Sequence, residues 1–391
     1  MDYSFDTIIE RRNTASSKWD NLQARFGRDD VLPLWVADMD FEAPKVVIDA
    51  LRERVEHGVF GYTIRTSAYQ EAIRNWFMVR HQYALEPEWL EYSHGVVHGL
   101  AMMIRAVTQP GDAIVIQQPV YFPFKTVVER QGRRLLVNPL LEEAGRYQMD
   151  LEHLERLFQN EKPKWMILCS PHNPIGRVWS KEELTALAKL CTAYDVSVLS
   201  DEIHCDFVYR PHQHHPFATL LPEMTDRTVT FVAPSKTFNI AGLHTAVVII
   251  PNEQYRQQYR DTLQEAFMGD PDVFGPVALE AAYRGGGEWL DALLVYLEGN
   301  YDFLREFLRT ELPDISVSPL EGTYLAWLDF RKLGMTDESL KDWMISKARL
   351  GLNAGETFGV GGSGFQRMNL GCPRPILADA LVRLSEAVQQ L

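Results

Sequence analysis

Short runs of consecutive apolar residues recur through the middle of the chain. Runs of this length are typical of strands that are buried on both faces of a sheet. They are Ala113–Ile116, Trp165–Cys169, Val196–Ser200, Thr228–Val232 and Ala246–Ile250. Helical patterns lie between several of them, as in Lys181–Tyr194, where the leucines at 184, 187 and 190 share a face. Strands that alternate with helices predict an α/β layer with a mostly parallel sheet.

The pattern changes after three consecutive glycines at 285–287. A long helical pattern follows, and after it come short strand-like runs at 315–318 and 324–328 and helical patterns at 337–349 and 376–390. The first 50 or so residues have weak periodicity. We therefore expect an N-terminal arm that also contributes to a small domain (1–50), a large α/β domain (51–287) and a small α+β C-terminal domain (288–391).

Composition narrows the possible partners of the chain. Among 391 residues, 46% are hydrophobic and the net charge is -14. An acidic chain is a poor match for nucleic acid and for anionic membrane surfaces. We find no apolar run long enough for a membrane span, no signal peptide and no closely spaced pair among the four cysteines. The expectation is a cytoplasmic protein without a disulfide framework, and with neither nucleic acid nor a membrane as partner.

Lys236 is the first candidate for chemistry. It follows a predicted strand, within Ala233–Gly242, among small and apolar residues. Ligands of α/β sheets bind at the carboxyl ends of strands. A desolvated lysine there can act as a nucleophile or base, and Ser235 beside it can donate to a phosphate. Taken alone, a surface loop lysine is the more common explanation.

Two other predicted strands also end in polar residues. The strand before Asp201 runs directly into this acid, which can pair with a protonated pyridine nitrogen, although a helix N-cap is an equal alternative. Asn173 lies in the turn Asn-Pro-Ile-Gly after the preceding strand and can donate its amide to a cofactor oxygen. Ordinary turn chemistry explains Asn173 as well.

Three further features complete the set. Gly95, with Val96 and Val97, enters a predicted helix, and backbone N–H groups at a helix start bind anions. Tyr121 follows a strand and can stack on a planar ring. Arg367, inside a short apolar strand, requires an anionic partner, and its guanidinium fork suits a substrate carboxylate. An internal salt bridge is the alternative for Arg367.

These elements, in this order, resemble the fold-type I enzymes that use pyridoxal 5′-phosphate (PLP), the aspartate aminotransferase superfamily. The shared pieces are Asn-Pro-x-Gly at 173–176, Ser-Asp-Glu at 200–202, Ser-Lys at 235–236 and the late Arg367. The resemblance covers nearly the whole chain. It implies an aminotransferase-like α/β fold, with a mostly parallel seven-stranded sheet between helices in the large domain.

Within that superfamily the chain is similar to the MalY/PatB group of cystathionine β-lyases, also called C–S lyases. The signals are Pro-Leu-Trp-Val-Ala-Asp-Met-Asp-Phe at 33–41, Phe-Gly-Tyr-Thr at 60–63, Ser-Asp-Glu-Ile-His at 200–204 and Asn-Leu-Gly-Cys-Pro-Arg at 369–374. His204 stands where aminotransferases usually have a tyrosine, and His244 where they usually have a phosphate-binding arginine. Phosphate binding should therefore rest more on the amides after Gly95 and on Ser235.

The resemblance implies a role for each candidate residue. Lys236 would hold PLP as a Schiff base and then act as the catalytic base, with Asp201 and Tyr121 as its catalytic partners. The cofactor would be bound by Lys236, Gly95, Val96, Val97, Tyr121, Asn173, Asp201, His204 and Ser235, and by Tyr62 from the other chain of a homodimer with a shared active site. The substrate would contact Arg367, Asp38, Met39 and Asn173.

The implied reaction is an α,β-elimination of L-cystathionine or a related cysteine S-conjugate, which yields a thiol, pyruvate and ammonia. The same residues serve an aminotransferase, which is the nearest alternative. A PLP-fold protein kept as a regulator or binding partner is an alternative of another class. The chain offers only a weak metal candidate, the loop Arg210–His215, because the loop lacks cysteine or carboxylate ligands at suitable spacing. We expect no metal.

Overall fold

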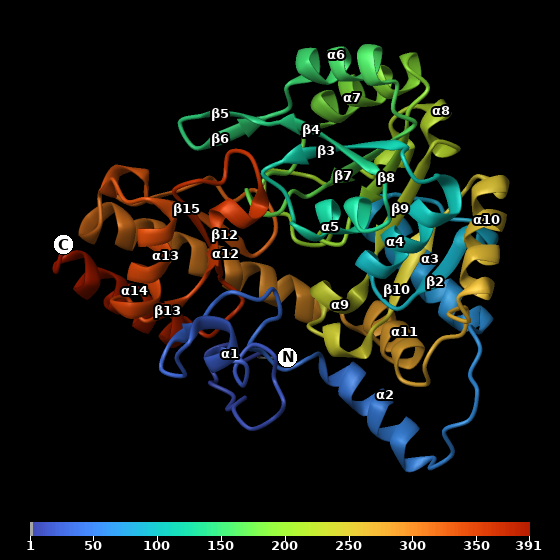
Figure 1. Cartoon of the computed structure of the whole chain (residues 1–391). Coiled ribbons are helices and arrows are strands. Elements are labelled where there is room, and N and C mark those ends of the chain that lie inside the picture. Colours follow the sequence, from blue (N-terminus) through green and yellow to red (C-terminus); the bar gives the residue numbers. More distant parts are fainter. Residues whose placement is uncertain (1–2) are drawn as a thin grey trace.

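The structure is a computed structural model that describes residues 3–391. Its largest sheet has seven strands, which cross the upper right of Figure 1. In chain order they are β2 (Leu90–Ser93), β3 (Ala113–Gln118), β4 (Arg134–Pro139), β7 (Trp165–Cys169), β8 (Ser197–Asp201), β9 (Thr228–Val232) and β10 (Ala246–Ile249). The spatial order is β2-β10-β9-β8-β7-β3-β4, and only β10 is antiparallel to its neighbours. The expected mostly parallel seven-stranded sheet is confirmed.

The remaining strands form three smaller sheets. β11 (Ser316–Val317), β12 (Leu325–Asp329), β15 (Phe365–Asn369) and β14 (Asn353–Ala354) form an antiparallel sheet of four, in that order. β5 (Leu141–Glu143) and β6 (Arg146–Gln148) form a hairpin. β1 (Leu32–Pro33) pairs in parallel with β13 (Leu350–Gly351), so the N-terminal segment is attached to the C-terminal one.

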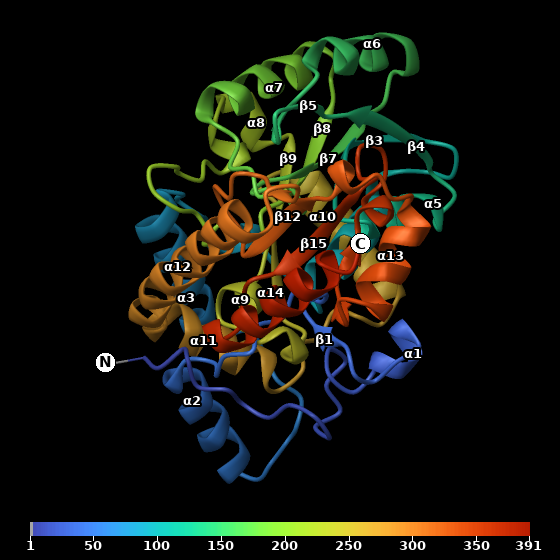
Figure 2. The same cartoon turned by 90° about the vertical axis from the view of Figure 1, so that its left-hand side faces the viewer.

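Helices cover both faces of the large sheet and flank the small one (Figures 1 and 2). They are α1 (Leu22–Phe26), α2 (Lys45–Glu56), α3 (Ser67–His81), α4 (Val96–Val107), α5 (Pro123–Glu129), α6 (Leu151–Glu161), α7 (Lys181–Ala193), α8 (Pro222–Thr225), α9 (Pro234–Thr237), α10 (Glu253–Glu265), α11 (Gly275–Gly285), α12 (Gly287–Glu311), α13 (Asp337–Ser346) and α14 (Arg374–Val388). Among residues 3–391, none of these helices has the length and hydropathy that crossing a membrane requires.

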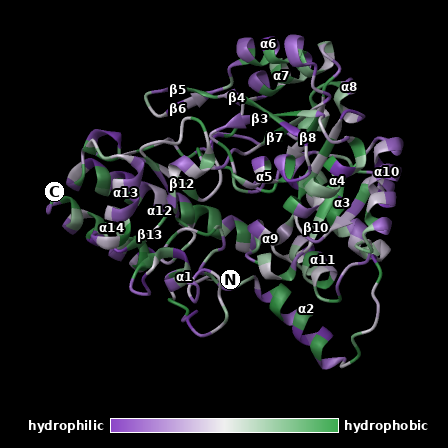
Figure 3. Ribbon diagram, viewed as in Figure 1, coloured by the Kyte–Doolittle hydropathy of each residue, from purple (hydrophilic) through white to green (hydrophobic). Residues whose placement is uncertain are grey.

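Alternate residues of the large sheet face opposite hydrophobic clusters. Ile114 and Ile116 pack with α4, α5 and α10, whereas Val115 between them packs with α6 and α7. Toward the β10 edge, Val247 joins a third cluster with α3 and α11. Figure 3 shows the result: the central strands are mostly hydrophobic, and polar residues lie on outer helices such as α10. Burial on both faces explains why these strands read as continuous apolar runs.

The four-stranded sheet has its own core with α13, α14 and the C-terminal half of α12. The expected strands and helices after residue 287 are present, although α13 ends at Ser346 because Leu350 already belongs to β13. The domain boundaries at residues 50 and 287 stay a prediction.

Candidate functional site

The carboxyl ends of the parallel strands meet at one edge of the large sheet, as such sheets require. There they enclose a cavity of about 230 Å³. It brings together Val96, Val97, Tyr121, Asn173, Asp201, His204, Lys236 and Arg367, all of them candidates from the sequence. The small sheet and the N-terminal segment close the other side of this cavity with Asn353 and with Trp35, Val36 and Ala37.

Lys236 lies on α9, the short helix that follows β9, with Pro234 at its first turn. Its amine donates to the carbonyl of Ala37 at 2.6 Å, and the hydroxyl of Tyr324 donates to the same carbonyl at 2.9 Å. Burial lowers the pKa of Lys236 to about 8. A larger share of this amine is therefore unprotonated at neutral pH than in an ordinary lysine, as a nucleophile or base requires.

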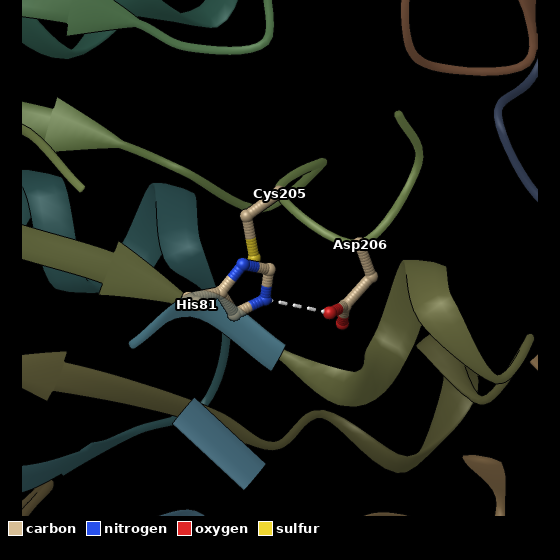
Figure 4. A group of neighbouring side chains, drawn as sticks. All are labelled: His81, Cys205 and Asp206. Carbon is tan, nitrogen blue, oxygen red and sulfur yellow. Dashed lines mark hydrogen bonds and ion pairs between the residues drawn. The ribbon is translucent and has the colours of Figure 1, made fainter. Parts of the chain in front are cut away.

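A buried network fixes α9 from behind. Asp206 accepts hydrogen bonds from Thr237 at 2.7 Å, from the ring of Trp76 at 3.1 Å and from His81 at 2.8 Å. Figure 4 shows His81 between Asp206 and Cys205, a group whose ligand-type atoms lie within 4.8 Å of one another. Because Asp206 already accepts three donors, this group is best explained as a support for α9, next to Lys236.

The two acids at the end of β8 have separate surroundings. Glu202 is paired with His214 at 2.9 Å and accepts from the hydroxyl of Ser200, which makes it part of the packing. Asp201 lines the cavity, where its carboxylate accepts one hydrogen bond from the amide of Ile203. Burial raises the pKa of Asp201 to about 7. A carboxylate so poorly compensated favours a cationic ligand group beside it.

Arg367, on β15, is buried and has no acidic partner among residues 3–391. Its guanidinium donates to the Asn173 side-chain oxygen, the Asn353 side-chain oxygen and the Trp35 carbonyl, at 2.9, 2.7 and 2.8 Å. All three acceptors are neutral, and burial lowers the pKa of Arg367 to about 10. The alternative of an internal salt bridge is therefore wrong, because the residues around this buried cation do not neutralise its charge.

Asn173 and Tyr121 are held against each other. The backbone amide of Tyr121 donates to the carbonyl of Asn173 at 3.0 Å. Since the side-chain oxygen of Asn173 accepts from Arg367, its NH₂ group is left for a ligand. The Tyr121 ring contacts the rings of Phe122 and Phe124 and lines the cavity.

The start of α4 and His204 complete the lining. Gly95 is the N-cap of α4, and Val96 and Val97 of its first turn line the cavity, so backbone N–H groups are available to an anion. Ser235 precedes Lys236 on α9. Burial, with the charges of Lys236 and Arg367, lowers the pKa of His204 to about 3, so its ring is neutral and can donate one N–H.

Five candidates do not line the cavity of the single chain: Gly95 and Ser235, which are each adjacent to a lining residue, and Tyr62, Asp38 and Met39. Tyr62 is fully exposed on the segment between α2 and α3. Asp38 is paired with Arg11 at 2.6 Å, and Met39 is buried in the core. The segment that contains Asp38 and Met39 reaches the cavity through the three preceding residues, Trp35, Val36 and Ala37. His244 is exposed at the end of a short 3₁₀ helix.

Three lining residues, Trp35, Asn353 and Arg25, were not predicted from the sequence. Trp35 stands in the motif at 33–41, three residues before Asp38, so the sequence does contain a signal for it. No sequence signal marks Asn353, because it reaches Arg367 only through the pairing of β14 with β15. Arg25 comes from the five-residue helix α1, which has no periodicity to detect.

The residues of this cavity fit PLP. The fit is tested by comparing the charges of these residues with the groups of PLP that they would bind. A buried lysine with a lowered pKa suits the aldehyde, an uncompensated carboxylate suits the pyridine nitrogen, and the start of α4 suits the phosphate.

Comparisons with known proteins agree with this geometry. Residues 29–384 match the family model of aminotransferase class I and II. The chain is 45% identical to the cystathionine β-lyase PatB of Bacillus subtilis, over 98% of this chain and all of that protein. It superposes on cystalysin from Treponema denticola, which contains PLP, with a TM-score of 0.97 and 37% identity over all of both chains. The PLP-bound C–S lyase of Staphylococcus hominis gives a TM-score of 0.93 at 34% identity, over 99% of this chain and 98% of that one.

Proposed function

The chain belongs to the aminotransferase class I and II family and uses PLP, and from this premise we propose that it is a carbon–sulfur β-lyase of the cystathionine β-lyase type. With water, L-cystathionine would give homocysteine, pyruvate and ammonia, and other cysteine S-conjugates would give their own thiols. The full-length 45% identity to a cystathionine β-lyase is the observation that carries the proposal.

Substrate binding is assigned to Arg367. A buried guanidinium without an acidic partner suits the α-carboxylate of an amino acid, to which its unpartnered Nε–H would donate. Asn173 and Asn353 hold the guanidinium in place. Fixing the carboxylate orients the Cα–H bond of the substrate relative to Lys236, which lines the same cavity.

Proton removal is assigned to Lys236. Its amine, with a pKa lowered to about 8 by burial, takes the proton from Cα of the substrate. When bound, PLP supplies the electron sink that makes this proton acidic. Asp201 holds a negative charge where the pyridine nitrogen would lie, and the Tyr121 ring offers a flat apolar surface for stacking.

The test of this function is a reaction without any keto acid. The purified protein loaded with PLP is incubated with L-cystathionine, and pyruvate and free thiol are measured over time. We expect both products to accumulate in equal amounts over many turnovers. An absence of pyruvate with cystathionine, cystine and other cysteine conjugates would contradict the lyase.

An aminotransferase is the second candidate, because the matching family model is that of the aminotransferases and the same residues would serve. It would stop after one half-reaction unless a keto acid is added. The same assay therefore separates the two activities. A purely regulatory PLP-fold protein would give neither result.

We also propose a homodimer with a shared active site. The segment between α2 and α3 protrudes at the bottom right of Figure 1, and it exposes Val59, Phe60, Tyr62 and Ile64. Exposed apolar side chains gathered on one segment are typical of an interface. Tyr62 would reach the phosphate of the partner's cofactor. Because all four cysteines are free, a cytoplasmic location is part of the proposal.

Subunit mixing tests the shared site. Lys236→Ala and Tyr62→Ala are each expected to be impaired, but a mixed dimer would contain one site with both native residues. Random mixing of the two variants in equal amounts should then restore about a quarter of the wild-type activity. Activity that stays at the average of the two parent variants would contradict a shared site.

A further inference from the structure

Arg25 is a second guanidinium at the cavity and has no assigned role. It lies on α1, exposed, and lines the same cavity as Lys236 and Arg367. Its guanidinium lies over the ring of Trp35, 5.2 Å from the ring centre. Among residues 3–391, no ion pair or hydrogen bond involves this guanidinium. Its five N–H donors are therefore available to a ligand.

Trp35 connects the two arginines. Its ring is held by the edge of Phe26, at 5.9 Å between centres, and supports Arg25, while its carbonyl accepts from Arg367 at 2.8 Å. One residue thus sets the positions of a deep and an outer guanidinium. Two cations in one cavity repel each other unless anions bind to them.

A second groove lies next to the cavity, and Arg25 lines both. This groove has a volume of about 210 Å³, and Glu356 and Gln366 line it as well. Arg25 is therefore a residue that the cavity and this groove share. A substrate held at Arg367 by its α-carboxylate would share this cavity with the side chain of Arg25.

We propose that Arg25 determines specificity by binding a carboxylate at the far end of the S-substituent. The inference rests on the proposed lyase function and refines its substrate class. Preferred substrates would be cysteine S-conjugates that carry a distal carboxylate, and neutral S-alkyl cysteines would be poorer. An arginine binds a carboxylate through paired, charge-assisted hydrogen bonds, which discriminate strongly against a neutral group.

A matched pair of substrates tests this proposal. S-(2-carboxyethyl)-L-cysteine and S-propyl-L-cysteine differ in a terminal carboxylate in place of a methyl group. In Arg25→Gln we expect kcat/KM for the carboxylated substrate to fall about tenfold, mainly through KM, and the value for the neutral substrate to change less than about twofold. Arg25→Lys should retain part of the preference because it keeps the charge.

Arg28→Gln is the control, because Arg28 lies three residues away and is paired with Asp30 outside the cavity. It should leave both substrates unchanged. Equal losses on both substrates in Arg25→Gln, or no loss on either, would overturn the role of Arg25. If the wild type releases no pyruvate from these two compounds or from L-cystathionine and cystine, the lyase proposal fails. Dissociation constants of the two compounds, from titration of the holoenzyme absorption, still decide the role of Arg25.

Discussion

Lys236→Ala is expected to lose the visible absorption band of covalently bound PLP and to lower kcat/KM for L-cystathionine by about 10⁴-fold, the upper range for a general base. No other lysine lines the cavity, as far as residues 3–391 define it. The variant should still bind PLP, but noncovalently, because Asp201 and the start of α4 remain. Absorption spectra and pyruvate release measure the two effects.

The physical reason is the environment of this one amine. Burial lowers its pKa to about 8, and α9 holds it in place through the hydrogen bond between Thr237 and Asp206. Lys164→Ala is a matched control, because Lys164 is exposed and paired with Asp195. Such an exposed ion pair contributes little to the stability of the fold. Reduction of the holoenzyme with borohydride should label the peptide that contains Lys236. A visible band that persists in Lys236→Ala, or a label on another lysine, would refute the assignment.

Much of this site could be predicted because its residues follow buried strands. The apolar runs before Asn173, Asp201 and Lys236 are β7, β8 and β9, which are neighbours in the sheet. Parallel neighbours end at the same edge, so a motif after each strand places its side chains together. The resemblance to a family then supplied roles that the spacing alone left open.

The parts that escaped prediction lie where the local pattern is weak. β4 is an edge strand that contains Arg134 and Pro139, and β2 is only four residues long. Neither shows the continuous apolar run of a central strand. Asn353 and Arg25 reach the cavity from short elements, and only tertiary pairing determines their position.

Asp201→Asn is expected to lower kcat/KM about 10²- to 10⁴-fold, because removing one partner of a buried charge pair costs roughly 3–5 kcal/mol. The pair in question is the carboxylate and the protonated pyridine nitrogen of bound PLP. The loss should appear in kcat with every substrate, since Asp201 would pair with the cofactor rather than with the substrate.

The same substitution should have the opposite effect on the stability of the cofactor-free protein. Burial raises the pKa of Asp201 from 3.8 to about 7 in the folded state. The unfolded chain therefore releases this proton at lower pH, and ionised Asp201 destabilises the fold increasingly between pH 4 and pH 7. The full effect, reached above pH 7, is at most about 4 kcal/mol. Urea unfolding of the cofactor-free proteins should show Asp201→Asn gaining stability over the wild type as pH rises, and reaching a plateau above pH 7.

Asp206→Asn is the contrasting control, because the carboxylate of this other buried aspartate accepts three hydrogen bonds. Burial opposes its ionisation, but hydrogen bonds from His81 and Thr237 hold its pKa below the usual value. A carboxyl with a lowered pKa stabilises the fold above its unfolded pKa and loses that contribution as pH falls. Asp206→Asn should thus destabilise the protein at pH 7 with or without PLP. Asp201→Asn should stabilise the cofactor-free form and weaken the PLP-bound form, because the pyridinium compensates the carboxylate only when PLP is present. Equal destabilisation of both forms by Asp201→Asn would make Asp201 a packing residue like Asp206 and would remove it from the cofactor site.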